Sequence, residues 1–74
     1  MKRFSITFST EEEAKDFALN FKGDEDFEGT TNYEDFEGNE ALVCFKDEFA
    51  DEAEMFIHGY SNFRGFHIVK IEQY

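Results

Sequence analysis

One pattern of residues occurs twice in the chain, at an offset of 39 positions. In the first copy, an alternation of apolar and polar residues, which is typical of a strand, precedes apolar residues at helical spacing. The second copy repeats this order, and the matched residues are Phe4 and Val43, Ile6 and Phe45, Glu12 and Asp51, Glu13 and Glu52, Ala14 and Ala53, Phe17 and Phe56, Phe21 and Tyr60, and Phe27 and Phe66. The chain is therefore predicted to fold as two similar halves.

In the first half, the segment from Arg3 to Ser9 places three apolar residues on one side, as a half-buried strand would. Thr10 stands where a helix N-cap is expected, and Glu13, three positions later, completes the pattern of a capping box. Gly23 is expected to end this helix as a C′ residue. The apolar face between these limits has the spacing i, i+3, i+4 and i+7 and consists of Ala14, Phe17, Ala18 and Phe21.

The middle of the chain is predicted to form a hairpin. Residues 30–36 are a weak and acidic candidate strand, and Gly38 with Asn39 supplies the residues of a tight turn. The continuous apolar run of residues 41–45 is suited to an interior strand of a sheet.

The second helix is expected to begin near Asp47, which can cap it, and to end near Gly59 and Asn62. Its predicted apolar face consists of Phe49, Ala53, Phe56, Ile57 and Tyr60. The last strand is expected to run from about residue 63 to residue 72 and is apolar on both of its sides.

The resulting order, β-α-β-β-α-β, is typical of the α+β fold called ferredoxin-like or split βαβ. Right-handed crossovers in both halves place two helices on one face of a four-stranded antiparallel sheet with strand order 4-1-3-2. We expect residues 1–74 to form a single domain of this kind. Its predicted core consists of Phe4, Ile6, Phe8, Phe17, Phe21, Val43, Phe45, Phe49, Phe56 and Ile57.

The chain carries 18 acidic and seven basic residues, a formal net charge of −11. This balance argues against direct nucleic-acid binding, because attraction to phosphates needs lysine and arginine. Between Glu11 and Glu54 there are 17 acidic residues and three lysines, a net charge of −14, whereas the remaining residues carry +3. Because the first and last strands are neighbours in the predicted sheet, acidic and weakly basic flanks are expected on opposite sides.

The sequence Glu-Asp-Phe-Glu-Gly occurs at 25–29 and again at 34–38. Carboxylates that alternate along an extended chain repeat every ~6.6 Å, because the rise is ~3.3 Å per residue. This spacing is close enough to that of nucleic-acid charges to compete for a basic groove. The alternative is that the acids only give solubility and keep an edge strand from pairing. The candidate partner-binding residues are Asp24, Glu25, Asp26, Glu28, Glu34, Asp35, Glu37 and Glu40.

We therefore predict a non-enzymatic binding protein without a cofactor, whose partner is a basic protein surface such as that of a nuclease or another nucleic-acid-binding complex. In size and charge the chain resembles small acidic proteins of phage and mobile elements that inhibit nucleases, restriction systems or CRISPR complexes. This resemblance implies a nucleic-acid mimic with an anti-restriction or anti-CRISPR role in the cytoplasm. Phe27, Phe36 or Tyr33 is expected to supply an apolar anchor.

Other functional sites find little support. Residues 24–35 match part of a calcium loop, but position 12 is aspartate instead of glutamate and the residues that follow predict a strand. Residues 64–71 resemble an RNA-binding signature found in domains of this architecture, but they lie on the wrong strand. His58, His67 and Cys44 are interpreted as structural, so no catalytic or metal site is predicted. No apolar run approaches the ~18 residues of a membrane span.

The open face of the predicted sheet has apolar residues left over. If alternate residues of the run 41–45 face the helices, Leu42 and Cys44 face away from them. One of two pairs is expected to join them there, either Phe66 with Ile68 or Val69 with Ile71. Because an uncovered apolar face usually contacts something, we expect a homodimer or a partner on it. The alternative function is a small regulatory or assembly module that acts through this face, without mimicry.

Overall fold

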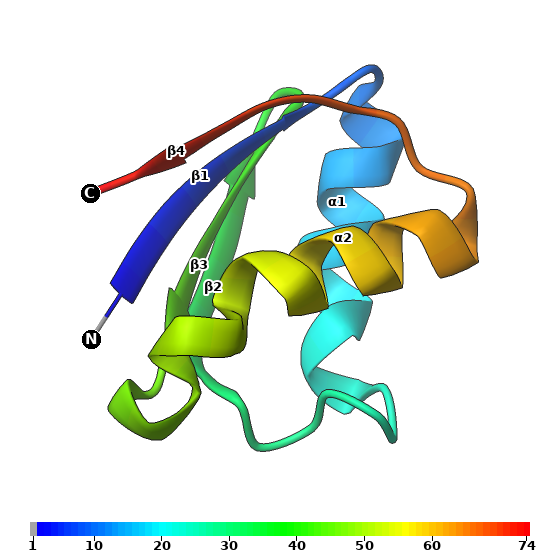
Figure 1. The fold of residues 1–74 in the computed structure, drawn as a ribbon. Helices are drawn as coiled ribbons and strands as arrows, with labels where there is room; N and C mark the ends of the chain where they lie inside the picture. The colour runs from blue at the N-terminus through cyan, green and yellow to red at the C-terminus, as the bar shows by residue number, and fades with distance from the viewer. Residues whose placement is uncertain (1) are drawn as a thin grey trace.

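The computed structural model of the protein describes residues 2–74, and its strands and helices follow the predicted order. The elements are β1 (Lys2–Phe8), α1 (Glu11–Asn20), β2 (Thr31–Glu37), β3 (Glu40–Phe45), α2 (Ala53–Arg64) and β4 (Ile68–Gln73), with short 3-10 helices η1 (Phe21–Gly23) and η2 (Asp47–Glu52). The strands form one antiparallel sheet in the order β2-β3-β1-β4, and both helices lie on one side of it (Figure 1). The predicted ferredoxin-like α+β fold is therefore confirmed.

The core between the sheet and the helices is built largely from aromatic rings. Phe21 lies at its centre, where its ring stacks on the rings of Phe17 and Phe27, with distances between ring centroids of 4.7 Å and 5.0 Å. The same ring makes edge contacts with Tyr60 at 5.2 Å and with Phe45 at 5.8 Å. Phe21 and Tyr60 are matched positions of the 39-residue repeat. The two halves of the chain therefore meet through equivalent side chains.

The predicted core is largely confirmed. Eight of its ten residues are buried, and Phe49 and Phe56 pack against the cluster while remaining partly exposed. Tyr60, which the sequence places on the apolar face of the second helix, is also fully buried. A domain of 74 residues has a high ratio of surface to volume, so bulky rings give it more apolar burial per residue.

The capping box at the start of α1 is confirmed. The Glu13 amide N–H donates to Thr10 Oγ1 at 3.2 Å, and the Thr10 amide donates to Glu13 Oε1 at 3.0 Å. The Glu13 carboxylate also accepts hydrogen bonds from the Ser9 hydroxyl and, at 2.8 Å, from the His67 amide. Hydrogen bonding from Ser9, opposed in part by desolvation and reinforced by the amide of His67, lowers the pKa of Glu13. One carboxylate thus ties the start of α1 to the segment that leads into β4.

The Glu13→Gln variant is expected to be less stable than the wild type by about 1 kcal/mol at pH 7, because a neutral side chain cannot hold all of these donors. Since the folded state lowers the pKa of Glu13, its stabilisation is full above the ordinary value of 4.5 and is lost as the pH falls through the folded-state pKa. The difference between the two proteins should therefore shrink on acidification. Urea unfolding at pH 7 and at acid pH measures it, with the exposed Glu12→Gln as control. An equal loss at both pH values would contradict this role.

Helix α1 ends differently from the prediction. It ends at Asn20, and residues 21–23 continue as the 3-10 helix η1. Gly23 does not take the left-handed conformation of a C′ residue, since its φ is not positive. The prediction for Gly23 is therefore wrong, because the tighter 3-10 turn carries Phe21 into the core without a left-handed residue.

Helix α2 begins later than predicted. Residues 47–52 first form η2, whose N-cap position is Lys46, with no side-chain hydrogen bond at that cap. α2 itself starts at Ala53 after Glu52, again without a side-chain cap. The predicted capping by Asp47 is wrong, because Asp47 is the first residue inside η2.

Helix α2 also ends later than predicted. It passes through Gly59 and ends at Arg64, where the following glycine takes a left-handed φ of 76°. The last part of the helix is held by the burial of Tyr60 and by an ion pair between Arg64 Nη2 and Asp16 Oδ2 at 2.8 Å. These tertiary contacts outweigh the low helix propensity of glycine. The prediction that Gly59 and Asn62 mark the end is therefore wrong.

A β-bulge in the pairing of β4 with β1 changes which residues of β4 face the helices. β4 begins at Ile68, later than predicted, because the preceding helix runs further. Ile68 and Ile71 lie opposite Phe8 and Ile6, respectively, with the register shift between these two pairs. Both isoleucines therefore pack against the core, and Val69 is left exposed.

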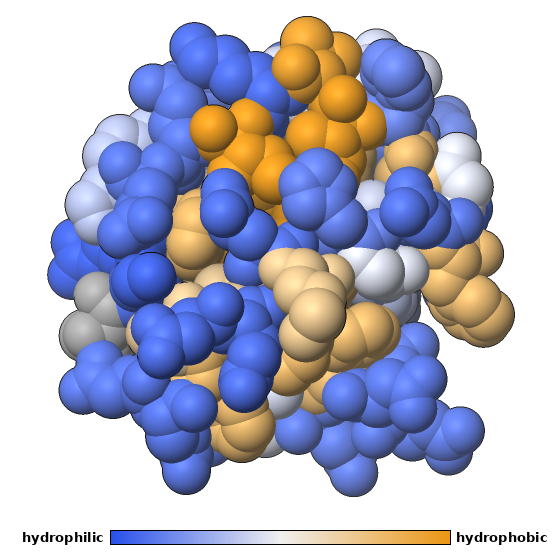
Figure 2. All heavy atoms as spheres, in the orientation of Figure 1, coloured by the Kyte–Doolittle hydropathy of each residue, from blue (hydrophilic) through white to orange (hydrophobic). Residues whose placement is uncertain are grey.

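The two predicted apolar pairs on the open sheet face are consequently wrong. Phe66, Ile68 and Ile71 pack against the core from the helix side, and the bulge separates Val69 from Ile71. Figure 2 shows, in the orientation of Figure 1, that the most apolar surface gathers near β4, while hydrophilic side chains cover most of the rest.

Candidate functional site

Three of the four acidic residues of the hairpin, Asp35, Glu37 and Glu40, lie on the open side of the sheet, away from the helices. Asp35 lies opposite Leu42, and Glu37 lies opposite Glu40 next to the turn. Because like charges directly opposite one another repel, the pair Glu37 and Glu40 destabilises this end of the hairpin. These members of the predicted set are exposed, as expected.

Glu34 does not belong to the exposed acidic surface. Its side chain is only 5 % exposed and lies 3.7 Å from Lys22 Nζ, and it accepts a hydrogen bond from the Thr31 hydroxyl. Glu34 points toward the helix side of the sheet, where Lys22 neutralises its charge. Its inclusion among the partner-binding residues is therefore not supported by its position.

The loop before β2 carries four predicted residues, Asp24, Glu25, Asp26 and Glu28. This loop is folded into turns, in which Asp24 Oδ1 accepts a hydrogen bond from the Asp26 amide at 2.9 Å. Of the two Glu-Asp-Phe-Glu-Gly copies, only residues 34–38 include extended chain. The ~6.6 Å spacing of an extended chain therefore applies to β2 and not to this loop.

Phe27 cannot serve as an exposed anchor. Its ring centroid lies 5.0, 5.5 and 5.9 Å from those of Phe21, Phe56 and Tyr60, so the ring covers one end of the core. Of the three predicted anchors, Tyr33 is the most exposed, at 55 %. Tyr33 lies on the open face, on the side of the sheet opposite the helices.

The structure brings η2 next to the loop before β2. The Lys46 amide donates to Thr30 O at 3.0 Å, and the two segments lie at the same end of the sheet (Figure 1). We call the carboxylates of these two segments the acidic end, and apart from Asp24 they belong to exposed residues. The acidic end consists of Asp24, Glu25, Asp26, Glu28, Asp47, Glu48, Asp51 and Glu52. The four acidic residues of η2 are absent from the predicted set of partner-binding residues. The predicted hairpin could have placed them here, because in an antiparallel pair the start of β2 lies beside the end of β3, from which η2 follows.

Several basic side chains are engaged by carboxylates elsewhere. Lys22 pairs with Glu34, Arg64 with Asp16 at 2.8 Å, and Lys70 with Glu72 at 2.9 Å, all outside the acidic end. Three of the seven basic residues are thus held away from it. The acidic end therefore carries eight carboxylates, and the one basic residue directly beside η2 is Lys46, which precedes it.

The other motifs do not build a site. Within residues 2–74, no three histidine, cysteine or acidic side chains are grouped so that they could hold a metal. In the calcium-like segment, the Thr30 hydroxyl donates to Phe27 O at 2.6 Å, and Asp35 Oδ1 accepts from the Phe36 amide at 2.8 Å. The RNA-binding-like segment begins inside α2, at Arg64. No helix in the described part of the chain is long and apolar enough to cross a membrane.

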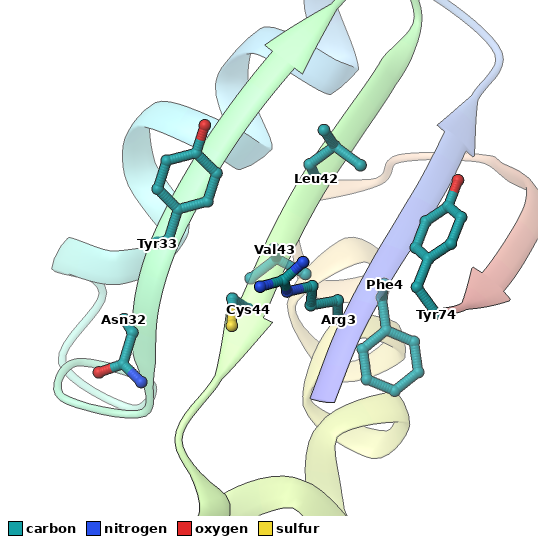
Figure 3. A pocket seen from close by; sticks show the side chains of 8 residues that line it. All are labelled: Arg3, Phe4, Asn32, Tyr33, Leu42, Val43, Cys44 and Tyr74. Atoms are coloured by element: carbon teal, nitrogen blue, oxygen red, sulfur yellow. The ribbon is translucent and has the colours of Figure 1, made fainter. Parts of the chain in front are cut away.

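A groove lies on the open face of the sheet (Figure 3). Its volume is about 710 Å³, and its lining residues are Arg3, Phe4, Asn32, Tyr33, Leu42, Val43, Cys44 and Tyr74. The Tyr33 hydroxyl donates to Asp35 Oδ2 at 3.1 Å, and this hydrogen bond raises the pKa of Tyr33. The expectation of a homodimer or a partner on this face stays a prediction.

Comparisons of the chain with protein families, with curated proteins and with solved structures find no significant match. Its function therefore has to be inferred from its own charges and surfaces.

Proposed function

We propose that the protein is a non-enzymatic inhibitor that mimics the charge of nucleic acid and occupies the basic groove of a nucleic-acid-processing enzyme or complex. The observation that carries this proposal is the position of the loop before β2 and of η2 at the same end of the sheet, where they place the eight carboxylates of the acidic end. Such a surface attracts a basic groove at long range, and association through it is fast and weakens with salt.

The hairpin supports the same function at the other end of β2. A groove that binds nucleic acid is elongated, and the chain offers carboxylates at both ends of this edge strand. The acidic end lies at the start of β2, and Glu37 and Glu40 lie beside the turn at its finish. The natural targets of such an inhibitor are nucleases, restriction systems and CRISPR complexes, so the proposed role is anti-defence activity of a phage or mobile element.

Competition with nucleic acid tests the proposal. The purified protein is titrated into nucleases, restriction enzymes and CRISPR effector complexes that hold fluorescent DNA or RNA, at low and at high salt. We expect displacement from at least one target at low salt and markedly less at high salt, because salt screens exposed charges over ~10 Å at 0.1 M. The proposal fails if no target releases its nucleic acid, or if release is insensitive to salt.

A further inference from the structure

The groove on the open sheet face differs in charge from the rest of the protein. The chain has 18 acidic residues, yet none of the eight residues that line the groove is acidic, and one of them, Arg3, is a cation. Figure 3 shows Arg3 reaching from β1 toward β3, with the Tyr33 ring on one side of the groove and the Tyr74 ring on the other. The groove therefore combines an apolar surface with a single positive group.

The guanidinium of Arg3 is available to a ligand. Arg3 is exposed, and among residues 2–74 no carboxylate pairs with it, in contrast to Arg64 and Lys70. The neighbouring carboxylates of this face are engaged elsewhere, since Glu72 pairs with Lys70 at 2.9 Å and Asp35 accepts hydrogen bonds from Tyr33 and Phe36. A guanidinium binds carboxylate or phosphate groups through two parallel hydrogen bonds.

The rest of the groove suits an apolar body. Leu42 is 39 % exposed, and Tyr74 is 70 % exposed, so apolar surface is accessible on both sides of Arg3. The volume of about 710 Å³ is within the range of roughly 300–1,000 Å³ that is typical of sites for small molecules. Such sites are mostly apolar and contain a few polar groups that orient the ligand.

We infer that this groove binds a small amphipathic anion, in which one carboxylate or phosphate is attached to an aromatic or aliphatic body. The anionic group pairs with Arg3, and the apolar body lies over Leu42 between the rings of Tyr33 and Tyr74. None of the residues of the acidic end lines the groove. This inference is therefore independent of the function proposed above.

Nuclear magnetic resonance titration of the ¹⁵N-labelled protein tests the inference. The probes are naphthalene-1-acetate and naphthyl phosphate, with naphthalene-1-acetamide as the neutral analogue and acetate or inorganic phosphate as anions without an apolar body. We expect shifts of the Arg3, Tyr33, Leu42 and Tyr74 amides with one or both amphipathic anions, and binding at least about tenfold weaker for the amide and for the simple anions. Whichever anion binds better identifies the preferred head group.

Two pairs of variants separate the groove from general charge and folding effects. Arg3→Gln and Lys2→Gln each remove one positive charge, but only Arg3 lines the groove, so the first should weaken binding about tenfold and the second less than about twofold. Leu42→Asn should also weaken binding, whereas Val69→Asn, which changes an exposed residue outside the groove, should not.

Three results would overturn the inference. The first is an equal effect of Arg3→Gln and Lys2→Gln, and the second is equal binding of the amide and the carboxylate. The third is a concentration-dependent dimer, seen by sedimentation, that broadens the groove amides and blocks the probes, because a second copy would then be the occupant. Failure here with successful competition in the nuclease panel would leave the proposed inhibitor function intact.

Discussion

The Phe21→Ala variant is expected to be less stable than the wild type by about 3–5 kcal/mol at 25 °C. The Phe21 ring is fully buried and touches the rings of Phe17, Phe27, Phe45 and Tyr60, so its removal leaves a cavity where both halves of the chain meet. Replacing a buried phenylalanine by alanine costs about 3–5 kcal/mol. A chain of 74 residues has a total stability of only about 4–11 kcal/mol, so this substitution removes much of it.

Phe63→Ala is the matched control for this prediction. Phe63 lies in α2 and is 80 % exposed, so the same change of side chain there should alter the stability by no more than about 0.5 kcal/mol. Circular dichroism and urea unfolding measure both variants. Equal stability of Phe21→Ala and the wild type would show that the aromatic cluster does not hold the two halves together.

Reversing four charges of the acidic end is expected to weaken binding to the basic target strongly. The variant carries lysine in place of Glu25, Glu28, Glu48 and Asp51, which are all exposed. Because each reversed charge should weaken binding by up to about 1 kcal/mol, the affinity should fall by roughly 10²- to 10³-fold. The measurement is the inhibition constant against the target from which the wild-type protein displaces nucleic acid, at low salt.

A second quadruple variant separates the position of the charges from their number. It carries lysine in place of Glu11, Glu12, Glu37 and Glu40, at the opposite end of the sheet, and both variants have a net charge of −3. Glu11 and Glu12 belong to the first turn of α1, so the stability of this variant must be measured as well. Because only two of its four reversed charges, Glu37 and Glu40, belong to the proposed binding surface, we expect its inhibition to fall by no more than about 30-fold. If its inhibition falls as much as that of the first variant, overall charge and not the acidic end governs binding.

Local signals in the sequence were sufficient to predict the first strand, the start of the first helix and the hairpin turn. The alternation in β1 and the capping box of Thr10 and Glu13 lie within a few residues of one another, and the structure contains both. The hairpin turn at Gly38 and Asn39 is likewise local and is present. These features were predictable because neighbouring residues determine them.

The element ends that the sequence misplaced depend on distant contacts. The end of α2 is set by the ion pair of Arg64 with Asp16, which lies 48 residues away along the chain, and by the burial of Tyr60. The faces of β4 are set by a bulge against β1, which moves Ile68 to the helix side. Hydrophobic periodicity carries no information about such a bulge, because it assumes an unbroken alternation.

The concentration of acidic residues at the candidate site could be predicted from the sequence, but their arrangement on the surface could not. The sequence showed that acids are concentrated between Glu11 and Glu54. Only the structure removed Glu34, which Lys22 neutralises, and brought the acids of η2 beside the loop before β2. The sequence predicted that Leu42 and Cys44 face the open side of the sheet, but not the groove that they form with Arg3, because its lining residues come from β1, β2, β3 and the segment after β4.

By itself, the sequence determined the order of elements, the strand topology and the excess of negative charge, because periodicity, capping and composition act locally or over the whole chain. The tertiary structure alone decided which carboxylates share a surface, which are neutralised and where the Arg3 cation meets apolar rings. The physical reason is that exposure and pairing depend on residues brought together by folding, such as Lys46 with Thr30 and Lys22 with Glu34.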